Sequence, residues 1–97
     1  MTQLDRIAHM EALLHDVSAA IRAYTGTPEQ RQRIQPMVDA LAAYYHSPQW
    51  LQDYEDDEAG RLPKTLKRGV LSQDAVYDLL QVWQEISRPD APLSHQP

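Results

Sequence analysis

The chain has 97 residues, a formal net charge of −5, no cysteine and no phenylalanine. This length fits one domain with a modest core and excludes a two-domain cofactor enzyme. The lack of cysteine rules out disulfides and thiolate metal sites, and fits the reducing cytoplasm in which we expect the protein to reside. The acidic balance argues against direct nucleic-acid binding, and no apolar stretch is long enough for a membrane span, so we expect neither partner.

Composition points to an all-α fold. Alanine and leucine together number 22, against 13 β-branched residues, and helix interiors favour the first set. We therefore predict a single helical domain over residues 1–87. Residues 88–97 contain three prolines and no apolar periodicity, which predicts a disordered C-terminal tail.

The first half of the chain predicts a long antiparallel helical hairpin. Over residues 4–24, apolar side chains recur at alternating spacings of three and four, and a similar pattern follows over 28–46. Between them, Gly26 suits a helix C-cap, while Thr27 and Gln30 suit a capping box around Pro28. Pro36 then either kinks or splits the second helix.

The second half predicts two further helices joined by a basic connector. A short third helix over residues 48–58 begins at the Ser47 cap, ends at Gly60 and is expected to bury Trp50, Leu51 and Tyr54. The connector has room for at most one helical turn, between residues 63 and 69. Ser72 caps an amphipathic last helix that extends to residue 87 and packs back on the hairpin, completing a small helical bundle.

A longer pattern resembles a known family. The run over residues 44–80 contains a tyrosine pair, Ser-x-x-Trp, an acidic box, Leu-Pro-x-x-Leu-Lys-Arg-Gly-Val-Leu-Ser and Asp-x-Val-Tyr-x-Leu-Leu. This combination is similar to a family of small bacterial proteins known as domain of unknown function 4298. The resemblance implies a shared fold and a region in which to look for a site, and it implies no catalytic residue.

The acidic box, which consists of Asp53 and residues 55–58, is the feature most like a site. Asp53, Glu55 and Asp57 match positions 1, 3 and 5 of an EF-hand loop. However, position 6 is Glu58 instead of glycine and position 12 is Lys64 instead of a carboxylate. Since four bases follow the five acids, we expect the third helix and the connector to pair through their charges. We predict no catalytic residue, no metal ligand and no cofactor.

We interpret the protein as a small non-catalytic module that binds another protein, or itself as a homodimer through the apolar seam of the hairpin. Aromatic side chains beside mixed charges are typical of protein interfaces. The candidate interaction surface comprises Tyr44, Tyr45, Trp50, Asp53, Tyr54, Asp57, Glu58, Arg61, Lys67, Arg68, Asp74 and Asp78. The alternatives are an acidic mimic that occupies a nucleic-acid-binding protein, and a small enzyme or divalent-metal-binding protein. Most of the excess negative charge lies on the last helix, which weakens the mimic interpretation of the acidic box.

Overall fold

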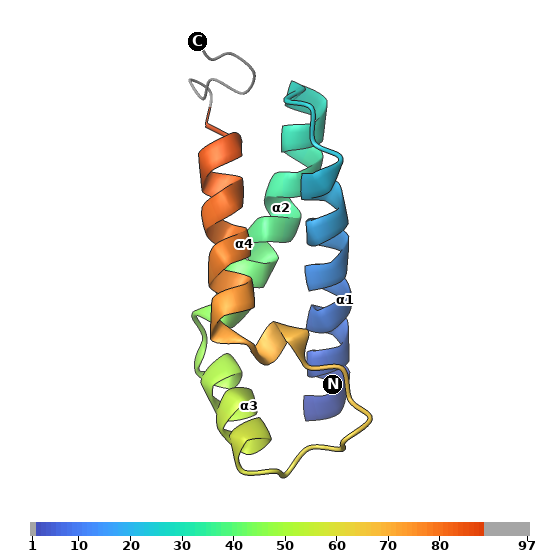
Figure 1. The fold of residues 1–97 in the computed structure, drawn as a ribbon, viewed down its shortest axis with the longest axis vertical. Coiled ribbons are helices and arrows are strands. Elements are labelled where there is room, and N and C mark those ends of the chain that lie inside the picture. The colour runs from blue at the N-terminus through green and yellow to red at the C-terminus, as the bar shows by residue number, and fades with distance from the viewer. Residues whose placement is uncertain (1, 89–97) are drawn as a thin grey trace.

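The structure, a computed structural model, describes residues 2–88. These residues form four α-helices and one 3₁₀ turn and contain no strand, which confirms the all-α prediction: α1 (Gln3–Arg22), α2 (Pro28–Tyr45), α3 (Pro48–Glu58), η1 (Gly69–Leu71) and α4 (Gln73–Ile86). Helices α1, α2 and α4 run side by side, and α3 and η1 lie at the end of the bundle where α1 begins (Figure 1). No helix of the described residues is long and apolar enough to cross a membrane.

Local capping chemistry explains where the helices begin. The side chain of Thr27 accepts a hydrogen bond from the backbone nitrogen of Gln30 in the predicted capping box, and Ser47 and Ser72 cap α3 and α4. The glycines of the two predicted stops, Gly26 and Gly60, have positive φ angles of 93° and 74°. Such angles are readily adopted only without a side chain. Gly60 directly follows Ala59, the C-cap of α3, and so ends that helix. The prediction that Gly26 caps the first helix is wrong, because α1 ends at Arg22 with Ala23 as its C-cap, and Gly26 lies in the hairpin loop.

Pro36 does not split α2. The helix is continuous from Pro28 to Tyr45, with Pro36 inside it and exposed to solvent. The missing backbone donor thus lies on the solvent side, where water can satisfy the carbonyl oxygen that it leaves free. On the opposite side, Ile34, Val38 and Leu41 keep their helical spacing and are buried.

Two apolar clusters make up the core. One lies between α2, α4 and the second half of α1 and is centred on Val17, Ile34, Val38 and Trp83. The other joins the first half of α1 and the second half of α2 to α3, the connector (residues 59–68), η1 and the start of α4. Its buried members are Ile7, Leu41, Tyr44, Trp50, Leu62, Val70, Leu71 and Val76. The connector is therefore tethered to the core, as predicted, and Leu71 and Val76 share a cluster across the α4 cap.

Two sequence predictions are corrected. Leu51, expected to be buried, is 51% exposed, because the neighbouring Trp50 and Asp53 occupy the inward side of α3. The short helical turn of the connector lies at Gly69–Leu71 instead of between residues 63 and 69. Two hydrogen bonds fix it there: the Val70 nitrogen donates to Glu11 Oε1 at 2.8 Å, and the Val70 carbonyl accepts from Trp50 Nε1 at 2.9 Å.

Candidate functional site

A buried carboxylate organises the end of the bundle where α1, α2 and α3 meet. Asp53 projects inward from α3 with none of its surface exposed to solvent. Arg6 of α1 donates to it through both Nε, at 3.0 Å from Oδ2, and Nη2, at 2.6 Å from Oδ1. This two-point contact is the strong geometry for an arginine–carboxylate pair, and it ties α1 to α3.

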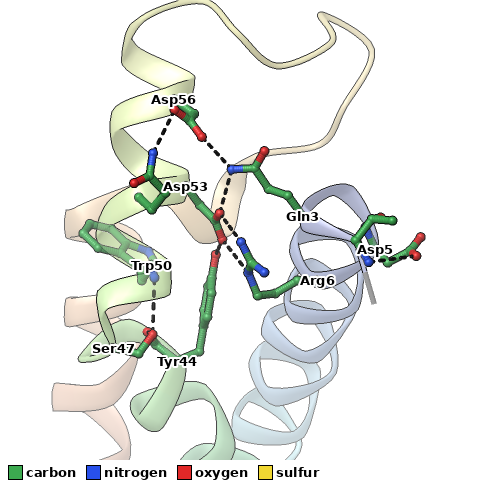
Figure 2. A network of polar contacts seen from close by, with 10 residues as sticks. Gln3, Asp5, Arg6, Tyr44, Ser47, Trp50, Asp53 and Asp56 are labelled. Carbon is green, nitrogen blue, oxygen red and sulfur yellow. Dashed lines mark hydrogen bonds and ion pairs between the residues drawn. The ribbon is translucent and has the colours of Figure 1, made fainter.

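Two neutral side chains complete the contacts of Asp53. The hydroxyl of Tyr44, on α2, donates to Oδ2 at 2.6 Å, and Gln3 Nε2 donates to Oδ1 at 2.9 Å (Figure 2). Gln3 also donates to Asp56 at 2.8 Å. We call Gln3, Arg6, Tyr44, Asp53 and Asp56 the polar network. Because each oxygen of Asp53 accepts two hydrogen bonds, the buried charge is fully satisfied.

The network shifts the pKa values of its members. Burial by itself would raise the pKa of Asp53, but hydrogen bonds from Arg6, Tyr44 and Gln3 outweigh it, and the pKa lies below its ordinary value. Burial, together with the hydrogen bond to Asp53, raises the pKa of the Tyr44 hydroxyl well above its ordinary value. Both groups therefore keep their usual charges at neutral pH: Asp53 is ionised and Tyr44 is neutral.

Two further carboxylates of the acidic box, Asp56 and Asp57, pair with bases of the connector, as predicted, whereas Glu55 and Glu58 are exposed. Arg61 contacts Asp56 at 3.0 Å, and Arg68 forms an ion pair with Asp57. Arg68 also donates to the carbonyl oxygens of Pro63 and Leu66, which fixes the course of the connector. Among residues 2–88, no three His, Cys, Asp or Glu side chains are placed to hold a metal ion together.

Asp53 does not follow the predicted pairing. Its partner is Arg6, which is 47 positions away in the sequence, and not a base of the connector. One signal for its burial lies in the sequence: Asp53 is three residues from Trp50, so both lie on the same side of α3. Gln3 and Arg6 were not predicted, because both are ordinary polar residues at the start of a helix.

The structure divides the predicted interaction surface by exposure. The side chains of Tyr44, Trp50 and Asp53 are buried, so these three residues cannot offer a binding surface. Their place in the core follows from their helical spacing toward α1 and η1 and from the hydrogen bonds that they form there. The half-buried members are Tyr45, Tyr54, Asp57 and Arg68, and the exposed members are Glu58, Arg61, Lys67, Asp74 and Asp78.

The aromatic members form a stack and do not gather on one open surface. The rings of Trp50 and Tyr54 are stacked at 5.1 Å between centroids, and Tyr45 meets Trp50 edge to face at 5.1 Å. The stack fills the space between the end of α2 and α3. It therefore stabilises the junction of these helices.

A groove of about 420 Å³ lies between α2 and α4. Aromatic and aliphatic side chains form most of its lining, namely Val38, Ala42, Tyr45, Tyr77, Leu80 and Trp83. Tyr77, on α4, is 52% exposed, whereas Trp83, on the same helix, is only 3% exposed. We call this feature the α2–α4 groove. Of its lining residues, the predicted interaction surface contained only Tyr45.

One amide group fixes the edge of the α2–α4 groove. Gln35 Oε1 accepts from the indole nitrogen of Trp83 at 2.9 Å, and Gln35 Nε2 donates to Asp39 Oδ1 at 2.8 Å. The first bond joins α2 to α4 across the groove. This hydrogen bond, together with the core cluster around Trp83, therefore fixes α2 and α4 relative to one another along the groove.

These features define a small all-α protein in which a buried ion pair fixes a short acidic helix against a helical hairpin. Within this class, the model of a domain of unknown function, DUF4298, matches residues 7–88, and the chain belongs to this family. The match confirms the family indicated by the sequence pattern. No curated protein and no solved structure matches the chain.

Proposed function

We propose that this protein is a non-catalytic helical module that binds another protein through the α2–α4 groove. The observation that supports the proposal is the aromatic lining of the groove, in which Tyr77 is 52% exposed and Tyr45 is half-buried. Large aromatic side chains are enriched at protein interfaces because they bury much apolar area at low conformational cost.

The polar network supports a structural role for the acidic box. A catalytic carboxylate needs a free oxygen that can reach a substrate, whereas both oxygens of Asp53 are occupied by protein donors. Asp56 and Asp57 likewise face arginines. These three aspartates thus serve to position α3 and the connector, which leaves the groove as the site that we assign to a partner.

The chain offers a closely matched pair of variants for a test. Tyr77, in the groove, is 52% exposed, and Leu51, on the outer side of α3, is 51% exposed. Each can be replaced by serine with little effect on the core. Affinity capture from a cell lysate with wild type, Tyr77→Ser and Leu51→Ser should retain the same proteins on wild type and Leu51→Ser, and lose them on Tyr77→Ser. Equal capture by all three would contradict the proposal.

A further inference from the structure

The charges around the α2–α4 groove identify the chemistry of its partner. None of the residues that line the groove is an aspartate, glutamate, lysine or arginine. Its lining combines apolar side chains with the polar side chains of Gln35, His46, Gln81, Gln84 and Ser87, so it suits a strip that is mainly apolar and carries no acidic or basic group. The groove lies between two neighbouring helices, which is where a further helix packs in a four-helix bundle. This geometry suits an amphipathic helix laid along the groove.

Acidic side chains border the groove on both helices. Asp74, Asp78 and Glu85 are exposed on α4 and lie within about 100° of Tyr77 around the helix axis, on its solvent side. Asp39 lies on the α2 edge, where it accepts from Gln35. Two bases, Arg31 in the first turn of α2 and Arg88 just after the end of α4, belong to the end of the bundle where α2 begins and α4 ends (Figure 1). Over most of its length the groove is thus apolar with an acidic rim.

We propose that the occupant of the α2–α4 groove is a basic amphipathic helix of a different protein, whose apolar side contacts Tyr77 and Leu80 and whose lysines or arginines face the acidic rim. This inference rests on the proposed function and names the class of partner. A second copy of the chain is disfavoured at this site. A symmetric contact through α4 would bring Asp74, Asp78 and Glu85 against the same residues of the other copy, with like charges opposed.

A larger groove elsewhere on the molecule gives no comparable assignment. It measures about 650 Å³ and lies between α1 and the connector, over Ala8 and Ala12. Its lining mixes acids with bases, including Glu11, Asp16 and Lys67, so its charge selects no class of partner. In a binding experiment, signals from Ala8 and Ala12 therefore show whether a ligand binds at this groove instead of the α2–α4 groove.

Two indole groups provide reporters for a binding experiment. The Trp83 indole N–H lines the α2–α4 groove and bonds to Gln35, whereas the Trp50 indole N–H bonds to the Val70 carbonyl in the other core cluster. The probe is an amidated peptide of about 18 residues, five helical turns, with leucine at helical spacing and lysine on the flanks. The control peptide has glutamate in place of every lysine. Each peptide is titrated into the full-length protein and followed by two-dimensional NMR. The basic peptide should shift the indole N–H signal of Trp83 and leave the indole N–H signal of Trp50 in place. The acidic peptide should shift neither signal.

Matched charge variants then test the rim itself. The triple variant Asp74→Asn, Asp78→Asn, Glu85→Gln should weaken binding of the basic peptide about tenfold at low salt, because three exposed charge pairs are removed. Asp16→Asn, Glu55→Gln, Glu58→Gln changes the net charge equally at exposed positions outside the groove, and should weaken binding much less. Raising the salt from about 50 to about 300 mM should reduce the difference between the two.

The outcomes separate this inference from the proposed function. Equal binding of both peptides, equal weakening by both triple variants, or shifts located at Ala8 and Ala12 would overturn the basic-helix inference. So would a dimer in sedimentation equilibrium that Tyr77→Ser dissociates. If lysate capture still depends on Tyr77 in these cases, the proposed function stands with another partner. Capture that is independent of Tyr77 would contradict the proposed function whatever the peptides do.

Discussion

The guanidinium group of Arg6 and the carboxylate of Asp53 form a two-point ion pair, with donor–acceptor distances of 3.0 and 2.6 Å, that closes a loop of 47 residues. Asp53 is fully buried, and the side chain of Arg6 is 20% exposed. Through this pair the first and third helices are fixed to one another, and Tyr44 adds the second helix. The end of the bundle where α1 begins is thus assembled around the negative charge of Asp53.

Replacement of Asp53 by asparagine should strongly destabilise the protein. Asparagine has nearly the same shape but leaves the Arg6 guanidinium without its carboxylate, and the loss of one partner of a buried ion pair costs about 3–5 kcal/mol. Urea unfolding at neutral pH, followed by circular dichroism, measures the free energy of unfolding. Asp56→Asn is the control, and it should cost clearly less because Asp56 is a more exposed member of the network. Equal losses in the two variants would contradict the assigned role of Asp53.

The same pair predicts how stability depends on pH. The pKa of Asp53 is lower in the folded chain than its unfolded value of about 3.9, so the unfolded chain takes up the proton first as the pH falls. The contribution of Asp53 is therefore fully present above about pH 5 and is lost below about pH 4. The difference in free energy of unfolding between wild type and Asp53→Asn should stay constant from neutral pH to about pH 5, and then narrow. A difference that widens on acidification would show that the sign of the shift is wrong.

Removal of the hydroxyl group should lower stability at Tyr44 and should leave it unchanged or raise it at Tyr24. The Tyr44 hydroxyl donates to the buried carboxylate at 2.6 Å, whereas the buried Tyr24 hydroxyl has no hydrogen-bond partner among the described residues. Tyr44→Phe should cost about 1.5–3 kcal/mol, the value of a hydrogen bond to a charged group. Tyr24→Phe should leave stability unchanged or raise it, since a buried polar atom without a partner is removed. Thermal and urea unfolding of the two variants provide the comparison, and a larger loss for Tyr24→Phe would contradict it.

Pro36→Ala should stabilise the protein. Proline inside a helix destabilises the folded chain by about 3 kcal/mol relative to alanine. Alanine has more conformational freedom in the unfolded chain, which offsets up to about 1 kcal/mol of this difference. The free energy of unfolding should therefore increase by about 2 kcal/mol. The side chain at this position is exposed, so no core contact is lost. The melting temperature should rise. A decrease would mean that the core between α2 and α4 needs the helix geometry that Pro36 imposes.

Capping chemistry made most of the helices predictable. Thr27, Ser47 and Ser72 each bond to a backbone nitrogen three residues later, and such bonds depend only on the adjacent sequence. The observed helix ends lie within two residues of the predicted ones. The first helix starts one residue earlier than predicted because Thr2 and Asp5 form a capping box. The residues of this capping box are visible in the sequence, but the apolar pattern that predicts the helix begins only at residue 4.

The candidate site was much less predictable. The charges of Asp56 and Asp57 are matched by bases nearby in the chain, so their pairing with the connector followed from sequence proximity. Asp53 belongs to the same acidic run, yet its partner lies on α1. The α2–α4 groove likewise joins residues such as Gln35 and Trp83, which are 48 positions apart. Contacts between residues so far apart in the chain leave no pattern in the local sequence that could predict them.

The sequence by itself determined the helices, their ends and the amphipathic pattern of α4, because propensity, capping and periodicity act over a few residues. Only the tertiary structure decided which acid is buried, which arginine neutralises it and which apolar side chains remain exposed. These outcomes depend on how the helices pack, since a buried charge such as Asp53 is stable only where distant donors, here Arg6 and Tyr44, converge on it.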